Sequence, residues 1–156
     1  MRKVLITFAL ALAGVGVAVS PASAATTNVY YETVADGDTQ FIPACTPGPD
    51  NPTCDPRGAG SRLISTGSLS YTQGGATIGS VHTDCTTTRK VGNDYYGFCT
   101  DTLTTPQGNS VAVGEINESA LERYEAQNLT LTGAHGCLTV QQVVYPNVFK
   151  LTVKRT

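Results

Sequence analysis

The sequence predicts an all-β protein in which eight antiparallel strands form a sandwich or a barrel. Two observations lead to this prediction. Short runs of alternating apolar and polar residues follow one another, separated by turns rich in Gly, Pro and Asn. Only 14% of the residues are charged, and Thr, Gly and Ser dominate the polar positions, which favours strands over helices. Eight strands also suffice for a closed barrel that holds one small ligand.

Residues 1–24 are predicted to be a secretory signal peptide, which is absent from the mature protein. Arg2 and Lys3 give a positive start, an apolar run follows, and Ala22-Ser23-Ala24 forms a small-x-small cleavage pattern. We therefore expect a secreted protein in which residues 25–156 form a single barrel domain.

The remaining chain excludes several classes of partner. It has no second apolar segment for a membrane and no basic patch or aromatic ladder for nucleic acid. No H-E-x-x-H or paired C-x-x-C motif indicates a metal site, and no cofactor is expected. An apolar small molecule is the expected ligand, and assembly into a homo-oligomer stays open.

The eight strands are expected at regular intervals along the mature chain. They cover residues 28–34, 62–71, 77–89, 94–105, 110–116, 128–132, 137–145 and 148–155. In the last strand Phe149, Leu151 and Val153 share one face, which we expect to be buried. Residues 36–38 are expected to form a turn, and residues 117–124 a short polar segment with one helical turn.

Residues 43–60 are predicted to be a long loop. This segment holds five prolines, three glycines, Cys45 and Cys54. Proline removes backbone donors and glycine breaks regular structure, so no strand ladder is expected. A loop of this length in a small domain is either functional or held by a cross-link.

Five cysteines survive signal-peptide cleavage, so at least one has no partner within the chain. Fifteen two-bridge pairings are compatible with the sequence. Closeness along the chain favours Cys45 with Cys54 and Cys85 with Cys99, which leaves Cys137 unpaired.

Residues 79–105 are predicted to be the central hairpin. Cys85 and Cys99 lie almost symmetrically about the turn at Gly92, so they fall on one face, close enough to bond. His82 and Asp84 fall on the opposite face. They form either a couple that orients a base or starts a metal site, or a structural or surface hydrogen-bonded pair, and the motif favours the second.

The order of several short motifs resembles the allene oxide cyclase and dirigent superfamily of eight-stranded barrels, in particular its small secreted bacterial members. The motifs are V-Y-Y-E-T at residues 29–33, the run around Gly67-Ser68-Leu69 before a turn, I-G-x-x-H-x-x-C at 78–85, G-F-C-T-x-T-L-x-x-P-x-G at 97–108, and L-T-G-A-H-G through V-V-Y-P-N-V-F-K-L-T-V at 131–153. This resemblance implies a closed barrel and a cyclisation that needs no cofactor.

The resemblance also implies two positions inside the barrel. Glu32 matches the glutamate of the cyclases, and Cys85 matches their cysteine on a later strand. Val34 stands where an asparagine is expected, and Gly67 lies near the place of a second asparagine.

The candidate catalytic residues are Glu32 and Glu115. Glu32 shares a face with Tyr30 and Val34, so an inward strand would bury its carboxyl among apolar groups and raise its pKa. Such a carboxyl donates a proton near neutral pH, and Glu115 would be its partner in the barrel mouth. Tyr30 and His82 are the candidate ligand-binding residues.

Two classes of function follow. The first is a cofactor-independent cyclase or isomerase, or a dirigent-like protein that steers a coupling reaction; both act by confinement and orientation. The second is a non-catalytic secreted barrel that binds an apolar ligand or another protein.

Overall fold

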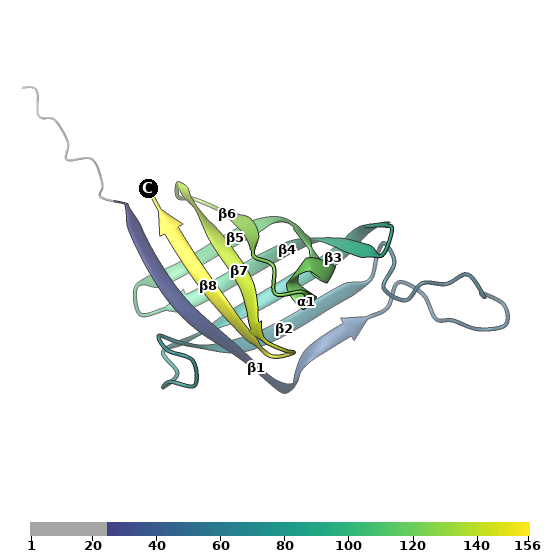
Figure 1. The fold of residues 1–156 in the computed structure, drawn as a ribbon, viewed down its shortest axis with the longest axis horizontal. Helices are drawn as coiled ribbons and strands as arrows, with labels where there is room; N and C mark the ends of the chain where they lie inside the picture. The colour runs from purple at the N-terminus through teal and green to yellow at the C-terminus, as the bar shows by residue number, and fades with distance from the viewer. Residues whose placement is uncertain (1–24) are drawn as a thin grey trace, which may run out of the picture.

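A computed structural model describes residues 25–156, and the predicted signal peptide lies outside the described residues. The chain forms a closed antiparallel barrel in which every strand pairs with the next and β8 pairs back onto β1 (Figure 1). The strands are β1 (Thr26–Ile42), β2 (Arg62–Ser70), β3 (Gly79–Val91), β4 (Asp94–Thr105), β5 (Gly108–Asn117), β6 (Gln127–Leu131), β7 (Gly136–Val144) and β8 (Val148–Arg155). The predicted eight-stranded barrel is confirmed.

The first strand is longer than expected, because the predicted turn at residues 36–38 lies within it. β1 runs for 17 residues and its register on β2 shifts between Val34 and Thr39. Gly37 takes a φ of +93°, which suits glycine, so the chain bends there without leaving the sheet. The first half of β1 pairs with both neighbours, while the second half extends past β8 toward the Pro-rich loop.

One end of the barrel is filled by side chains. Leu69, Leu103, Leu138 and Leu151 point inward and are almost fully buried. Tyr30 closes this end. Its ring stacks on that of Tyr71 with 5.9 Å between the ring centres, and its hydroxyl donates a hydrogen bond to Gln107 Oε1 at 3.2 Å. The alternation in β8 is also confirmed, because Leu151 and Val153 are buried and Phe149 packs against the core.

The other end carries the short helix α1 (Glu118–Glu122), as the predicted helical turn at residues 117–124 suggested. Asn117 caps this helix, accepting a hydrogen bond from the Ala120 backbone N–H at 3.1 Å. Ala120 is buried and Leu121 packs against the core. β5 and β6 pair over only two residue pairs, Ala112 with Leu131 and Val113 with Thr130, so the strands separate just before the helix.

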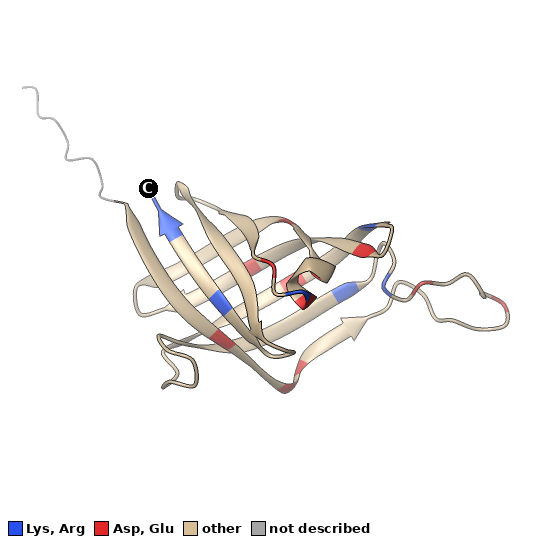
Figure 2. Cartoon of the chain, viewed as in Figure 1, with Lys and Arg blue, Asp and Glu red and all other residues tan. Residues whose placement is uncertain are grey.

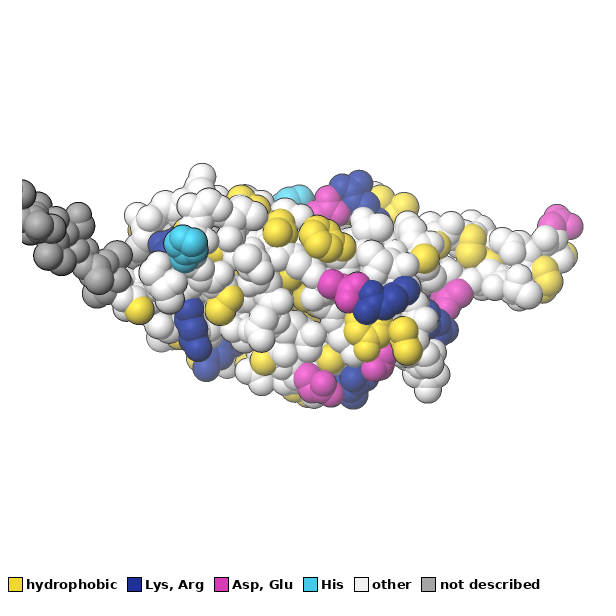
Figure 3. Space-filling model, turned by 90° about the horizontal axis from the view of Figure 1, so that it is seen from above, with side chains coloured by type: hydrophobic (Ala, Val, Ile, Leu, Met, Phe, Trp, Pro, Cys, Tyr) yellow, Lys and Arg dark blue, Asp and Glu magenta, His cyan; other side chains and the backbone are white. Residues whose placement is uncertain are grey.

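The Pro-rich loop projects from this same end as a narrow extension (Figures 1 and 3). A disulfide joins Cys45 to Cys54, as predicted. The base of the loop is anchored by Asp55, which accepts hydrogen bonds from Lys90 Nζ at 2.8 Å and Tyr95 Oη at 3.0 Å. The cross-link and these contacts together hold a segment that has no ladder of its own.

Among residues 25–156, no helix is long and apolar enough to cross a membrane.

Candidate functional site

A cavity of about 270 Å³ occupies the half of the barrel that the leucine layer leaves open. Its mouth lies between α1 and the β7–β8 turn, because Leu121, Tyr145 and Pro146 line it there. The wall is mainly apolar and includes Leu63, Cys85, Cys99, Ile116, Leu129, Val140 and Phe149. An apolar recess with a few polar groups is the usual form of a small-molecule site.

Glu32 lies inside this cavity, as its alternation with Tyr30 and Val34 predicted. The β1 strand places all three side chains on the inner face, and Glu32 is only 4% exposed. Its carboxyl group lines the cavity and has no hydrogen-bonding partner among the described residues. A buried carboxyl without a partner in the protein is available to a ligand.

Gly67 makes room for the Glu32 side chain. It lies on β2 and pairs with Val34 on the neighbouring strand β1, and a Cβ atom on Gly67 would lie 2.4 Å from Glu32 Cγ and 2.5 Å from Oε1. Real Cβ atoms essentially never approach that closely, so any other residue would displace the carboxyl. The glycine near the place of an expected asparagine therefore has a steric role here.

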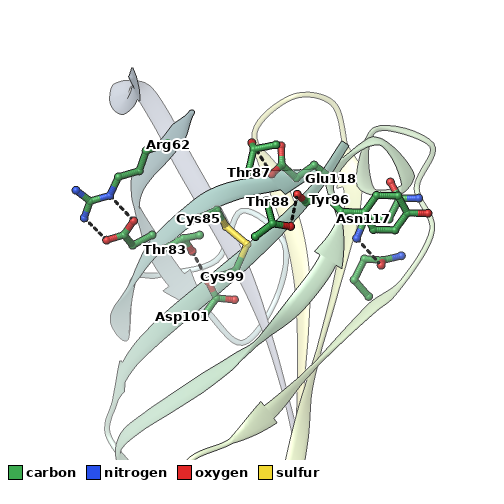
Figure 4. Close-up of a disulfide and its surroundings, with 12 residues drawn as sticks. Arg62, Thr83, Cys85, Thr87, Thr88, Tyr96, Cys99, Asp101, Asn117 and Glu118 are labelled. Carbon is green, nitrogen blue, oxygen red and sulfur yellow. Dashed lines mark hydrogen bonds and ion pairs between the residues drawn. A yellow bond between two sulfur atoms is a disulfide. The ribbon is translucent and has the colours of Figure 1, made fainter. Parts of the chain in front are cut away.

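Asp101 is the second acid of the cavity, and the sequence analysis missed it. It is 4% exposed and accepts a hydrogen bond from Thr83 Oγ1 at 2.7 Å (Figure 4). Strand alternation contains the signal that would have identified it. Asp101 lies two residues after Cys99 on β4, so it shares the inner face with the predicted disulfide.

Burial raises the pKa of both carboxyls. Desolvation, and next the nearby charge of Asp101, raise the pKa of Glu32 to about 8. Desolvation raises the pKa of Asp101 to about 6, while the hydrogen bond from Thr83 acts in the opposite direction. Like charges in one low-dielectric space resist joint ionisation, so the two groups titrate as a pair. Near pH 7 the pair holds one proton, mainly on Glu32.

The Cys85–Cys99 disulfide forms part of the cavity wall (Figure 4). The two cysteines are directly paired between β3 and β4, and the next inward pair along the hairpin is Thr83 with Asp101. The predicted pairing is confirmed, and Cys137 is left as a free thiol. Cys85 therefore stands inside the barrel without a thiol group.

Glu118 is a third acid in the cavity wall, on the first turn of α1. It accepts a hydrogen bond from Thr87 Oγ1 at 3.1 Å (Figure 4). Thr87 in turn accepts one from Ser61 Oγ at 2.8 Å. Desolvation raises the pKa of this half-buried carboxyl. Gly97 on β4 leaves the necessary space, because a Cβ there would lie 2.1 Å from Glu118 Oε1.

The rim of the cavity is formed partly by the base of the Pro-rich loop. Arg57 lines the mouth, lies 4.6 Å above the ring centre of Tyr95, and forms an ion pair with Glu122 of α1 at 3.2 Å. Figure 2 shows several acidic positions on and around this helix. The loop, the central hairpin and α1 thus meet at the entrance.

The prediction that Glu115 pairs with Glu32 in the barrel is wrong. Glu115 lies on the outer wall, exposed, and forms an ion pair with Arg89 that holds its pKa below the usual range. Ala112, Gly114 and Ile116 face inward instead. A Cβ on Gly114 would lie 3.2 Å from Leu129 Cδ2, which is a tight contact, so there is little room for a side chain at this position.

His82 and Tyr30 do not meet the cavity either. His82 is exposed on the outer wall, where its Nδ1 lies 3.2 Å from Thr66 Oγ1. Asp84, also outside, pairs with Arg62, so the simple surface reading of this motif fits the structure. Tyr30 points inward as predicted, but it fills the closed end beyond the cavity.

Residues 25–156 contain no group of three or more His, Cys, Asp or Glu side chains that could hold a metal ion.

Comparisons with solved structures find the same kind of barrel. One is described as pyocyanin demethylase, with a TM-score of 0.66 and 19% identity over 84% of this chain and 100% of that one. A nonspecific heme-binding cyclase that catalyses a (4 + 2) cycloaddition during neoabyssomicin biosynthesis gives a TM-score of 0.61 and 15% identity over 87% of this chain and 66% of that one. The Diels-Alderase AbmU from Streptomyces koyangensis gives a TM-score of 0.58 and 14% identity over 85% of this chain and 64% of that one.

These likenesses define the class of fold, a small closed barrel also found in cyclases. At 14–19% identity they show the fold alone. No protein-family model matches the chain, and the search of curated proteins finds no match.

Proposed function

We propose that this protein binds a small, mainly apolar molecule in its lumen and promotes a proton-assisted intramolecular rearrangement, as a cofactor-independent cyclase or isomerase. The observation that carries the proposal is the Glu32 carboxyl, which is buried, has no protein partner among the described residues and faces an open cavity. A burial cost of this kind is usual at functional sites.

The two acids divide the chemistry between them. Protonated Glu32 donates a hydrogen bond or a proton to an epoxide, carbonyl or phenol oxygen of the ligand. Ionised Asp101, held by the Thr83 hydroxyl, accepts a proton or stabilises positive charge that develops during the rearrangement. The apolar wall excludes water and holds the ligand in a reactive conformation, which supplies the rest of the rate enhancement.

Two lines of similarity support a cyclase-like activity. Two structural neighbours are described as cyclisation catalysts, namely the neoabyssomicin cyclase and the Diels-Alderase. The motifs that resemble allene oxide cyclases place their glutamate at Glu32, which lies inside the barrel.

Secretion belongs to the same proposal. The residues 1–24 have the composition of a signal peptide, and the two disulfides suit an oxidising compartment. We propose that the mature protein is a single domain of residues 25–156.

One observation favours a second candidate, a barrel that binds or orients its ligand without making bonds. Cys85 is bonded to Cys99, so the position where the cyclases have a cysteine offers no thiol. In that case Glu32 is a polar anchor in an apolar pocket, as a dirigent-like protein would need.

The test uses a ligand found by a thermal-shift screen of small molecules on the mature protein. Glu32→Gln keeps the shape of the side chain and removes its titrating proton. Turnover is measured by mass spectrometry of the product. In Glu32→Gln we expect turnover to fall by about 10²–10⁴-fold, while the affinity for the ligand changes little. Asp101→Asn should also lower turnover, and Glu115→Gln, on the outer wall, serves as the matched control.

The outcomes separate the candidates. Loss of turnover in Glu32→Gln and in Asp101→Asn, with Glu115→Gln unaffected, supports the enzyme. A ligand that binds without ever being converted, and whose affinity depends on Glu32, supports the binding barrel. Equal binding and turnover in the wild-type protein and both cavity variants would exclude a role for this pair.

A further inference from the structure

Carboxyl oxygens are prominent among the polar groups that line the cavity, and several of them accept no hydrogen bond from the described residues. The Thr83 hydroxyl donates to Asp101 at 2.7 Å, and the amide nitrogen of Gln142 donates to the Pro146 carbonyl at 2.8 Å. A carboxylate can accept up to about four hydrogen bonds, and Asp101 receives one from the described residues. A ligand with N–H donors can therefore occupy acceptor positions that the wall leaves free.

The charges of the cavity are equally one-sided. Glu32, Asp101 and Glu118 line the interior, whereas Arg57 is the one basic residue in the described lining. Arg57 sits at the rim, where its charge is engaged by Glu122 at 3.2 Å and by the Tyr95 ring. No other basic residue lies in the described lining, so the negative charge of ionised Asp101 has no cationic partner there.

The Glu32 carboxyl distinguishes this cluster from an ordinary group of surface acids. It is 4% exposed, has no partner among the described residues and lines the cavity beside Phe149, with which it is paired across β1 and β8. Apolar walls concentrate the field of the neighbouring carboxylates inside the lumen, which attracts cations and repels anions.

We propose that the ligand of this lumen is a small, mainly apolar cation, such as a protonated amine, whose N–H groups donate to Asp101 and Glu118. This proposal rests on the proposed binding function and names its ligand class. An apolar carboxylic acid of the same size is excluded, because its carboxylate would meet like charges with no basic partner inside. The mainly apolar wall accommodates the hydrocarbon part, and the acids select the charge.

The test compares three probes with the same hydrocarbon frame, namely phenylpropylamine, phenylpropanol and phenylpropionic acid. Each is titrated into the mature protein at pH 7 by isothermal calorimetry. We expect the amine to bind at least tenfold more tightly than the alcohol, and the acid to bind most weakly. Asp101→Asn should lower the affinity for the amine at least tenfold and change the affinity for the alcohol less than threefold.

Asp84→Asn is the matched control. Asp84 lies on the same hairpin and carries the same charge, but it points to the outer wall and pairs with Arg62. This variant should bind the three probes with the same order of affinities as the wild-type protein. If the acid or the alcohol binds as tightly as the amine, the charge preference is overturned while lumen binding stands. If none of the three binds, both proposals are overturned.

Discussion

At the scale of single residues, the account depends on two carboxyls that share one desolvated space. Glu32 accepts no hydrogen bond from the described residues and Asp101 accepts one. The surrounding residues therefore do not offset the free-energy cost of removing these carboxyls from water. A buried charge without a partner destabilises the folded state. The chain tolerates this cost by keeping a proton on the pair, which also gives the cavity an acid and a base near neutral pH.

This cost predicts how stability depends on pH. The pKa of Glu32 is raised from 4.5 to about 8 and that of Asp101 from 3.8 to about 6. The folded state therefore binds more protons than the unfolded state between about pH 4 and pH 8, and the free energy of unfolding falls as pH rises through this window. Above this window the loss is complete.

Urea unfolding at pH 5 and pH 8.5 measures the effect. Glu32→Gln should be more stable than the wild-type protein at pH 8.5 and should show a flatter dependence on pH. Glu115→Gln, which removes an exposed acid, should follow the wild-type curve. A wild-type protein that gains stability toward pH 8.5, relative to Glu32→Gln, would contradict the assignment.

Gly67 gives a steric prediction. Gly67→Ala places a Cβ 2.4 Å from Glu32 Cγ, so the carboxyl must leave its place in the cavity. We expect a loss of about 1–3 kcal/mol in the free energy of unfolding, as in other overpacked cores, together with a loss of ligand binding. Gly48→Ala is the control, because a Cβ there meets nothing within 4 Å. Identical ligand binding in Gly67→Ala and the wild-type protein would exclude the steric role.

At the scale of elements, the central hairpin of β3 and β4 was the most predictable part. The two-residue turn after Val91 and the Cys85–Cys99 pairing both follow from strand alternation about Gly92. The same alternation also predicts that Asp101, two residues after Cys99, points into the barrel. The error at β5 has a physical cause, since Val111 and Val113 suggest a buried face while the crowded lumen accepts Ala112 and Gly114.

The two disulfides should contribute differently to stability. Cys85–Cys99 joins two strands within the barrel wall, so replacing both residues by Ala should cost about 2–4 kcal/mol in urea unfolding. Cys45–Cys54 cross-links a loop that projects from the barrel, and its removal should act mainly on local order with a smaller global loss. An equal or larger loss for the Cys45–Cys54 variant would show that the loop is part of the cooperative unit.

At the scale of the whole molecule, the barrel divides into a packed end and an open end. Leucines and the Tyr30–Tyr71 stack fill one half, and the other half keeps a cavity whose mouth is framed by α1 and the base of the Pro-rich loop. Strand number and closure could be predicted from alternation and turn spacing. The lumen acids could be predicted only in part, because sequence fixes which face a residue occupies but not how deep the leucine layer reaches.

The central claim is that Glu32 and Asp101 share one proton in this lumen at neutral pH. Carbon-13 NMR of the side-chain carboxyls, titrated from pH 3 to pH 10 and assigned with Glu32→Gln and Asp101→Asn, measures it directly. We predict one carboxyl that titrates near pH 8 and one near pH 6, with the lower value assigned to Asp101. Titration of both groups below pH 5 would contradict the claim.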